Sequence, residues 1–431
     1  MAAHERLQRG RVRAARAVRA LSPRRPARRI WSYLLAERRT LRQGLGALLL
    51  STGAGIVAGV ALGSISKTLV VLPSLFILIP AAVGMKGTIF GAIGARLGTA
   101  THAGLFQITR ARTGVLYQNA YVGIITTFSS CLYLAALARL SALAFGYTSI
   151  SFLDFVTISV IGGVLGSAVE MALTIGLSLV AYRRGYDLDT VSTPIVTASG
   201  DMVTIPFLFL ASLIVRYAHP ASTVIAWIAI AVCLYASVRG FMTKLPLARR
   251  AILEMTGVIL LTPLFDIAAG TAVEPRIVRF QVYPALLVII PPLVSNAGAL
   301  GGILSSRLSS KLHLGVISAK VFPEPIALLD GALVMVSGLF AFLAVGTIGY
   351  VYGLFRGANL GAGVMIGGTV LTGMIATAIA IFVGYFVAVL SSRFGLDPDN
   401  QSVPIITSVM DLAGIVSFLV VLSLLGVVTH G

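Results

Sequence analysis

Apolar runs of 20 or more residues recur from about residue 43 to the end of this 431-residue chain. An α-helix rises 1.5 Å per residue, so each run can cross the roughly 30 Å hydrocarbon core of a bilayer. Charged residues make up only 11% of the chain, against about 25% in soluble domains. A transmembrane barrel would instead show segments of about ten residues with alternating polarity. The sequence therefore predicts an all-α polytopic membrane protein.

Clusters of charged residues divide the apolar sequence into eleven candidate membrane spans. Their approximate limits are 43–65, 69–97, 119–145, 153–181, 190–216, 222–240, 251–273, 280–308, 327–352, 361–391 and 401–428. We expect the second and eighth spans to be interrupted, because glycines and prolines break up their helical pattern.

Two segments of the chain recur at nearly one offset, which indicates a duplicated unit. PSLFILIPAAVGMKG, from Pro73, aligns without gaps to PALLVIIPPLVSNAG, from Pro284, at an offset of 211. DLDTVSTPIVTASGD, at 187–201, aligns to DPDNQSVPIITSVMD, at 397–411, at an offset of 210. We predict a basic, disordered cytoplasmic tail (1–42), a first five-helix repeat (43–217), a linker helix and loop (218–250) and a second repeat (251–431).

The linker run at 222–240 decides how the two repeats are oriented in the membrane. Five helices per repeat would leave the second repeat inverted, and one further span restores its orientation. The two repeats are then parallel, related by an axis along the membrane normal. Basic residues gather in the loops on the side of the tail, which predicts an N-terminus inside and a C-terminus outside.

The first 42 residues contain thirteen arginines. We interpret them as a cytoplasmic tail attracted to anionic lipid; an organellar transit peptide is the alternative. No aromatic residue lies among the basic ones before Trp31, so we do not expect nucleic-acid binding. We expect the plasma membrane in preference to an organellar membrane.

Two aspartates, Asp201 and Asp411, hold equivalent positions in the repeated acidic segments. Each lies about eleven residues into its predicted span, roughly 16 Å deep and near the midplane. A carboxylate costs several kcal/mol there unless it faces water or a cation. Thr197 and Thr407 precede them by four residues and share their helix faces. Because carboxylate and hydroxyl oxygens suit hard cations, we predict a metal site of these four residues. The alternative is a protonated aspartate hydrogen-bonded between helices.

Further residues are candidates for a pore or its mouth. Four aspartates at the cytoplasmic ends of the fifth and eleventh spans either cap helices or form a vestibule that attracts cations. One more acid lies in the seventh span, and glycines in the second and eighth spans permit close packing or unwound backbone. The candidates are Asp187, Asp189, Asp397, Asp399, Asp266, Gly87 and Gly298.

Lys86 and Glu170 are charged residues within apolar runs and have no equivalent in the second repeat, where Ala297 and Ala380 align with them. Lys86 either pairs with an acid or snorkels towards the membrane surface, and Glu170 belongs either to an ion path or to an internal pair. Three other acids lie near predicted helix ends, where we expect them to act as caps: Asp154, Glu254 and Asp330.

The pattern P-x6-P-x3-[G/S]-x2-G, followed by ARLGTATHAG in one half and SRLSSKLHLG in the other, occurs together with DxD-x4-P-x6-D in each half. These motifs resemble the MgtE-type magnesium transporters and their two-repeat relatives, the solute carrier 41 family. The resemblance covers nearly the whole chain after residue 40. It implies a cation pore between two five-helix units, lined by the aspartate in the last helix of each unit. Those aspartates are Asp201 and Asp411 in this chain.

The sequence thus predicts a divalent cation transporter or channel, with Mg²⁺ as the expected ion and no enzymatic activity or cofactor beyond the transported ion. A proton- or Na⁺-coupled divalent cation exporter is the alternative within transport. An intramembrane aspartate-dependent enzyme is the alternative from another class, although neither HExxH nor GxSxG occurs. We expect either a monomer with internal pseudo-twofold symmetry or a homodimer.

Overall fold

A computed structural model describes residues 38–102, 106, 109, 111–184, 188–313, 315–394 and 403–427 of the chain. Within these ranges every regular element is a helix. Ten of the helices are long and apolar enough to cross a membrane. The prediction of an all-α polytopic membrane protein is therefore confirmed. The predicted tail, residues 1–42, lies almost entirely outside the described ranges.

The same order of helices occurs twice along the chain, with one helix between the two sets. The first half contains α3 (Arg38–Ser64), α4 (Ser66–Val71), α5 (Leu75–His102), α6 (Val115–Ala144), α7 (Phe152–Arg184) and α8 (Leu188–Tyr217). The intervening helix is α9 (His219–Phe241). The second half contains α10 (Pro246–Val273), η1 (Glu274–Arg276), α11 (Ile277–Val282), α12 (Pro284–His313), α13 (Pro325–Phe355), η2 (Gly363–Gly367), α14 (Gly368–Phe394) and α15 (Val403–Leu424). The repeat limits given above remain a prediction.

The first predicted span, 43–65, accounts for the difference between eleven expected spans and ten candidate spans in the described chain. It falls within α3, whose described apolar stretch, Leu48–Ser64, is shorter than the 18 residues of a full span window. Arginines at the start of α3 make that end of the helix polar.

The predicted second and eighth spans, 69–97 and 280–308, are interrupted as expected, close to Pro73 and Pro284. The prolines and glycines further along these spans do not break the helices. Helix α5 continues through Pro80, and α12 continues through Pro291 and Pro292. Membrane helices tolerate the hydrogen bonds lost at proline when neighbouring helices cover the site. The breaks come earlier in the chain, between α4 and α5 and between α11 and α12.

Ser74 forms the break before α5 and ties the two halves together. Its φ of 65° lies in the left-handed region, which a non-glycine residue adopts only with local support. The Ser74 amide donates a hydrogen bond to Glu274 Oε1 at 2.6 Å, and its hydroxyl donates to the Thr148 carbonyl at 2.8 Å. Because Glu274 follows α10, the start of α5 is held by a residue from the other half.

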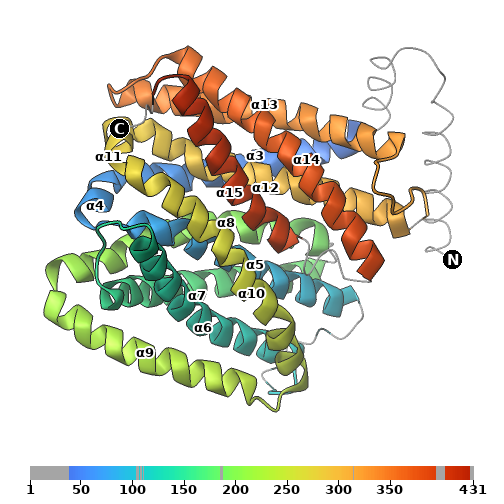
Figure 1. The fold of residues 1–431 in the computed structure, drawn as a ribbon. Helices are drawn as coiled ribbons and strands as arrows, with labels where there is room; N and C mark the ends of the chain where they lie inside the picture. The colour runs from blue at the N-terminus through green and yellow to red at the C-terminus, as the bar shows by residue number, and fades with distance from the viewer. Residues whose placement is uncertain are drawn as a thin grey trace, which may run out of the picture.

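The first helix of each half packs against the other half. Helix α3 lies along α12, and α10 lies along α5 (Figure 1). At the crossing of α3 and α12, Gly59 lies so close to Val288 that a Cβ at position 59 would overlap the Val288 carbonyl group. A Cβ at Gly270 would lie 2.8 Å from the Ile77 carbonyl oxygen. Glycines thus let backbones meet directly at both crossings, as is common between membrane helices.

Helix α9 lies along the edge of the bundle, mainly against α6 and α7 (Figure 1). Its outer face exposes Trp227, Ile228 and Tyr235. Since large apolar side chains on an outer face suit contact with lipid, α9 covers the side of the bundle and leaves its centre to other helices.

Candidate functional site

Four acidic side chains from four helices gather in the middle of the bundle. They are Glu170 on α7, Asp201 on α8, Asp266 on α10 and Asp411 on α15. Glu170 and Asp266 are fully buried, Asp201 is 8% exposed, and Asp411 is half-buried. Charge interactions connect Glu170 with Asp201, Asp201 with Asp411, and Asp411 with Asp266. The acids therefore form one connected group that includes residues of both halves.

Asp266 and Asp411 lie within hydrogen-bonding reach of each other. The Ser408 hydroxyl donates to Asp266 Oδ2 at 3.4 Å, while Asp266 Oδ1 has no hydrogen-bond partner among the described residues. A Cβ at Gly84 of α5 would lie 2.7 Å from Asp266 Oδ2, so the missing side chain leaves room for this carboxyl. Two carboxyl groups this close are stable only with a shared proton or a cation between them.

Asp201 has a different set of neighbours. Its carboxyl is within hydrogen-bonding reach of the Ser295 hydroxyl on α12, and Ser295 Oγ lies 2.9 Å from Ser51 Oγ on α3. The adjacent Asn296 donates to Thr52 Oγ1 at 2.8 Å. The crossing of α3 and α12 therefore provides Asp201 with neutral polar neighbours, whereas the neighbour of Asp411 is a second acid.

The structure places Asp201, Asp411 and Asp266 in one group whose charges interact. Thr407 lies one helical turn before Asp411 and contacts Gly298, where a Cβ would lie 3.2 Å from Thr407 Cγ2. The Thr407 hydroxyl donates to the Pro404 carbonyl at 2.9 Å, which leaves its lone pairs available to a cation. The assignment of these residues as metal ligands remains a prediction.

Several predicted site residues fall where the structure gives no side-chain geometry. Asp187, Asp397 and Asp399 lie outside the described residues, and Asp189 and Thr197 belong to the part of α8 whose side chains are not described. Gly87 lies within α5, and the backbone there is helical and not unwound.

Serines contribute to the site in a way that the sequence analysis missed. Ser295 and Ser51 accompany Asp201, and Ser408 accompanies Asp266. The only feature of the sequence that points to these serines is their position as small polar residues within otherwise apolar spans. Because a serine can satisfy its own helix backbone, that signal alone does not distinguish a site residue from a packing residue.

The three acids predicted as caps have different roles. Asp154 accepts hydrogen bonds from the Ser151 amide and hydroxyl at the start of α7, as a cap does. Asp330 is fully buried and binds Arg307 at 2.7 Å and also Lys311, so the expectation that it only caps a helix is wrong. Asp330 on α13 joins this helix to α12, because Arg307 and Lys311 of α12 both form ion pairs with its carboxylate. Glu254 forms an exposed pair with Arg250 at 2.7 Å.

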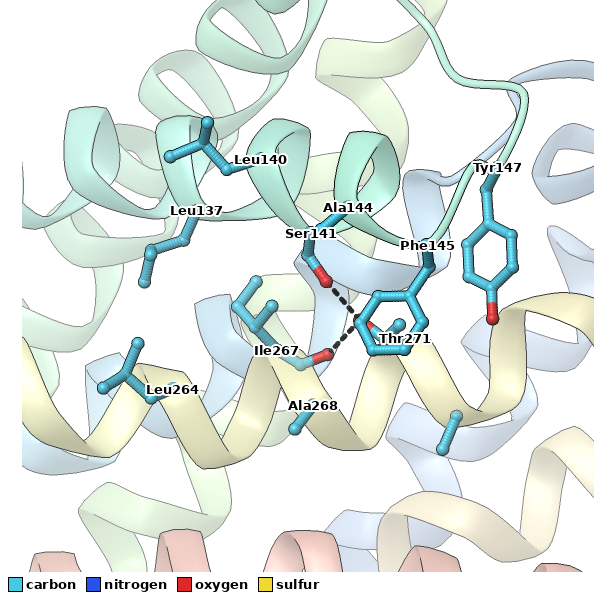
Figure 2. A pocket seen from close by; sticks show the side chains of 11 residues that line it. Leu137, Leu140, Ser141, Ala144, Phe145, Tyr147, Leu264, Ile267, Ala268 and Thr271 are labelled. Carbon is cyan, nitrogen blue, oxygen red and sulfur yellow. Dashed lines mark hydrogen bonds between the residues drawn. The ribbon is translucent and has the colours of Figure 1, made fainter.

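An apolar pocket of about 440 Å³ lies between α6 and α10 (Figure 2). Its polar groups include Ser141 Oγ and Thr271 Oγ1, 2.7 Å apart, and Thr271 also donates to the Ile267 carbonyl. Leu140 and Phe145 at its rim are exposed. No charged residue lines the pocket, so it has no counter-charge for a cation.

The donors around Asp201 and Asp411 suit a cation that keeps part of its water shell. Among the described residues, no three His, Cys, Asp or Glu side chains are arranged to enclose a metal ion. Mg²⁺ is commonly held by one or two carboxylates and several waters. A pair of aspartates with nearby hydroxyls is such a set.

A bundle of membrane-spanning helices with acids at its centre is the arrangement expected of an integral membrane protein that handles ions. The family model described as "MgtE: Divalent cation transporter" matches the chain twice, at residues 79–211 and 290–421. The chain belongs to this family of divalent cation transporters. It is therefore a transporter and not an enzyme, as predicted.

Two members of solute carrier family 41 support this assignment. Solute carrier family 41 member 3 of Rattus norvegicus is 24% identical over 79% of this chain and 77% of its own length. Solute carrier family 41 member 2 of Mus musculus is also 24% identical, over 79% of this chain and 62% of its own length. The crystal structure of the eukaryotic MATE transporter AtDTX14 covers 92% of this chain and 97% of its own, at 13% identity and a TM-score of 0.36.

Proposed function

We propose that this divalent cation transporter carries Mg²⁺ along a path between the two halves, with Asp201 and Asp411 as its principal ligands. The observation that carries this proposal is the charge interaction between a buried acid from α8 and a half-buried acid from α15 at the centre of the bundle. Thr197 and Thr407 are the supporting oxygen donors. Inward movement of a divalent ion gains about 4.6 kcal/mol at 100 mV, so the membrane potential alone can drive it.

The test is ion uptake into proteoliposomes that contain the purified protein, with Mg²⁺, Mn²⁺, Co²⁺ and Ca²⁺ supplied separately. The double variant D201N/D411N keeps side-chain volume and removes both charges. We expect its uptake to fall at least about tenfold, because an amide replaces a charged ligand on each side. E254Q is the matched control, since Glu254 is an exposed acid paired with Arg250 outside the site.

Two results would contradict the proposal. Normal Mg²⁺ uptake by an inserted D201N/D411N variant would exclude these aspartates as the principal ligands. Uptake of Mn²⁺ or Co²⁺ by the wild type, without uptake of Mg²⁺, would exclude Mg²⁺ as the cargo.

Proton-coupled export is the second candidate, and the Asp266–Asp411 pair specifically favours it. Two acids within hydrogen-bonding reach retain a proton when no cation is bound. Binding of a divalent ion would release that proton. Transport measured with and without an imposed pH gradient separates the two candidates, because a channel for Mg²⁺ alone does not respond to the gradient.

The cellular context belongs to the same proposal. We place the protein in the plasma membrane with its N-terminus inside and its basic tail, residues 1–42, against anionic lipid. One chain with two pseudo-symmetric halves would suffice for transport. An epitope tag at the N-terminus that antibodies reach in intact cells would contradict this orientation.

A further inference from the structure

Lys86 is a buried cation in the middle of α5. It lies eleven residues after the helix start at Leu75 and is only 4% exposed. Lys86 Nζ has no hydrogen-bond partner among the described residues. An ammonium group in a membrane interior requires a compensating charge or water.

Glu170 on α7 is the acid whose charge interacts with the Lys86 ammonium group. It is fully buried, and neither of its carboxylate oxygens has a partner among the described residues. Thr174, one turn further along α7, has an equally buried and unpartnered hydroxyl. Lys86 and Glu170 thus compensate each other's charge without a direct bond between them.

Two glycines create the space that these side chains occupy. A Cβ at Gly166, one turn before Glu170, would overlap Lys86 Nζ. A Cβ at Gly200, immediately before Asp201, would overlap Glu170 Oε1. The ammonium therefore lies along α7 beside Glu170, and the carboxylate lies between Lys86 and Asp201.

The second half has no such pair. Ala297 and Ala380 stand at the positions that align with Lys86 and Glu170, and both are fully buried. Helix packing closes this region, since a Cβ at Gly301 would lie 2.7 Å from the Ile406 side chain and 3.6 Å from the Ala380 side chain. Packing in this fold therefore does not require charged residues at these two positions.

We propose that Lys86 is a built-in counter-cation that neutralises Glu170, so that the transported divalent cation meets the charge of Asp201 without the added charge of Glu170. This inference rests on the proposed function, because it concerns the same carboxylates. The effect arises from charge alone: a divalent ion at Asp201 meets a neutral Lys86–Glu170 pair, and loss of either partner changes the local charge by one unit. Lys86 thereby limits how tightly the ion is held and favours its release.

The test is a charge cycle on the detergent-purified full chain, with Mg²⁺-dependent thermal stabilisation as the measure of ion affinity. K86M leaves Glu170 uncompensated and should lower the Mg²⁺ concentration for half-maximal stabilisation about tenfold. E170Q leaves Lys86 uncompensated and should raise it about tenfold. The double variant K86M/E170Q should fall near the wild type, because the local charge is again neutral. K86R keeps the charge and should also resemble the wild type.

K320M is the matched control for loss of a positive charge. Lys320 pairs with Glu324 at 3.2 Å and its side chain is 64% exposed, so its removal should leave the affinity for Mg²⁺ unchanged. If K86M alone does not fold, E170Q and K86M/E170Q still test the role of Lys86. The double variant should then bind Mg²⁺ more tightly than E170Q does.

The outcomes separate this inference from the proposed function. If the wild type responds to Mg²⁺ but K86M and E170Q do not shift affinity in opposite directions, the counter-cation role is wrong and the proposed function stands. If neither Mg²⁺, Mn²⁺ nor Co²⁺ stabilises the wild type, the proposed function fails. The pair is then judged by unfolding without ions: each single variant must be less stable than the double variant, or the pairing is wrong too.

Discussion

Gly84 on α5 contacts the Asp266 carboxyl so closely that one added methyl group would displace it. The Cβ of an alanine would lie 2.7 Å from Oδ2 and 3.2 Å from Cγ of Asp266. Ordinary van der Waals contact begins at 3.4 Å, so the carboxyl must retreat by at least 0.7 Å, which is 3.4 minus 2.7 Å. The end of an aspartate side chain can make this movement, so the fold should survive G84A.

The displacement should instead reduce ion affinity, because Asp266 lies beside Asp411. Small shifts of site groups cost large factors in other tuned sites. We expect the Mg²⁺ concentration for half-maximal uptake to rise about tenfold, equivalent to about 1.4 kcal/mol. Uptake into proteoliposomes at a series of Mg²⁺ concentrations measures this change directly.

G91A is the matched control for this prediction. Gly91 lies on the same helix, and a Cβ there would have nothing within 4 Å. Both substitutions raise the helix propensity of α5 equally, so their difference isolates the contact with Asp266. Equal uptake curves for G84A and G91A would refute the reasoning that Gly84 positions the Asp266 carboxyl.

The remaining predictions concern stability. D330N should lower the free energy of unfolding by about 3–5 kcal/mol, because it leaves Arg307 and Lys311 without their buried carboxylate. G59A should cost about 2–3 kcal/mol, because its Cβ would overlap the Val288 backbone where α3 crosses α12. Unfolding in detergent, followed by circular dichroism, measures both.

Each stability prediction has a control in the same chain. E254Q breaks an ion pair whose side chains are 81% and 43% exposed, and such pairs contribute at most about 1 kcal/mol. G53A lies on α3 with nothing within 4 Å of a Cβ. A D330N variant as stable as E254Q would show that the buried cluster does not stabilise the α12–α13 contact. If G59A and G53A unfold alike, Gly59 does not determine the crossing.

Much of the fold could be predicted because long apolar runs identify membrane helices in a sequence. The recurring segments around Pro73 and Pro284 also placed corresponding helices, α5 and α12, at corresponding points of the chain. The depth argument selected Asp201 and Asp411 for the centre of the bundle, where the structure brings them together. These features depend on local sequence and on helix geometry alone.

Partners across helices could not be predicted in the same way. Asp266 meets Asp411 because α10 packs against α5 and α15, an arrangement that no spacing within α10 reveals. Asp330 resembled a cap because it lies near the start of α13, and its role depends on Arg307 and Lys311 of α12. Tertiary packing decides such contacts. The periodicity of a single sequence shows helix faces but not which residues of two helices meet.

The duplicated aspartates occupy unequal surroundings. On the side of Asp411, Asp266 adds a second acid that attracts a cation. On the side of Asp201, the neighbours are hydroxyl groups and the neutral pair of Lys86 and Glu170. G84A should therefore weaken ion binding from the first side, whereas K86M should strengthen it from the second. Opposite shifts in the affinity for Mg²⁺ would indicate that the charges around the two aspartates differ, whereas shifts in the same direction would contradict this.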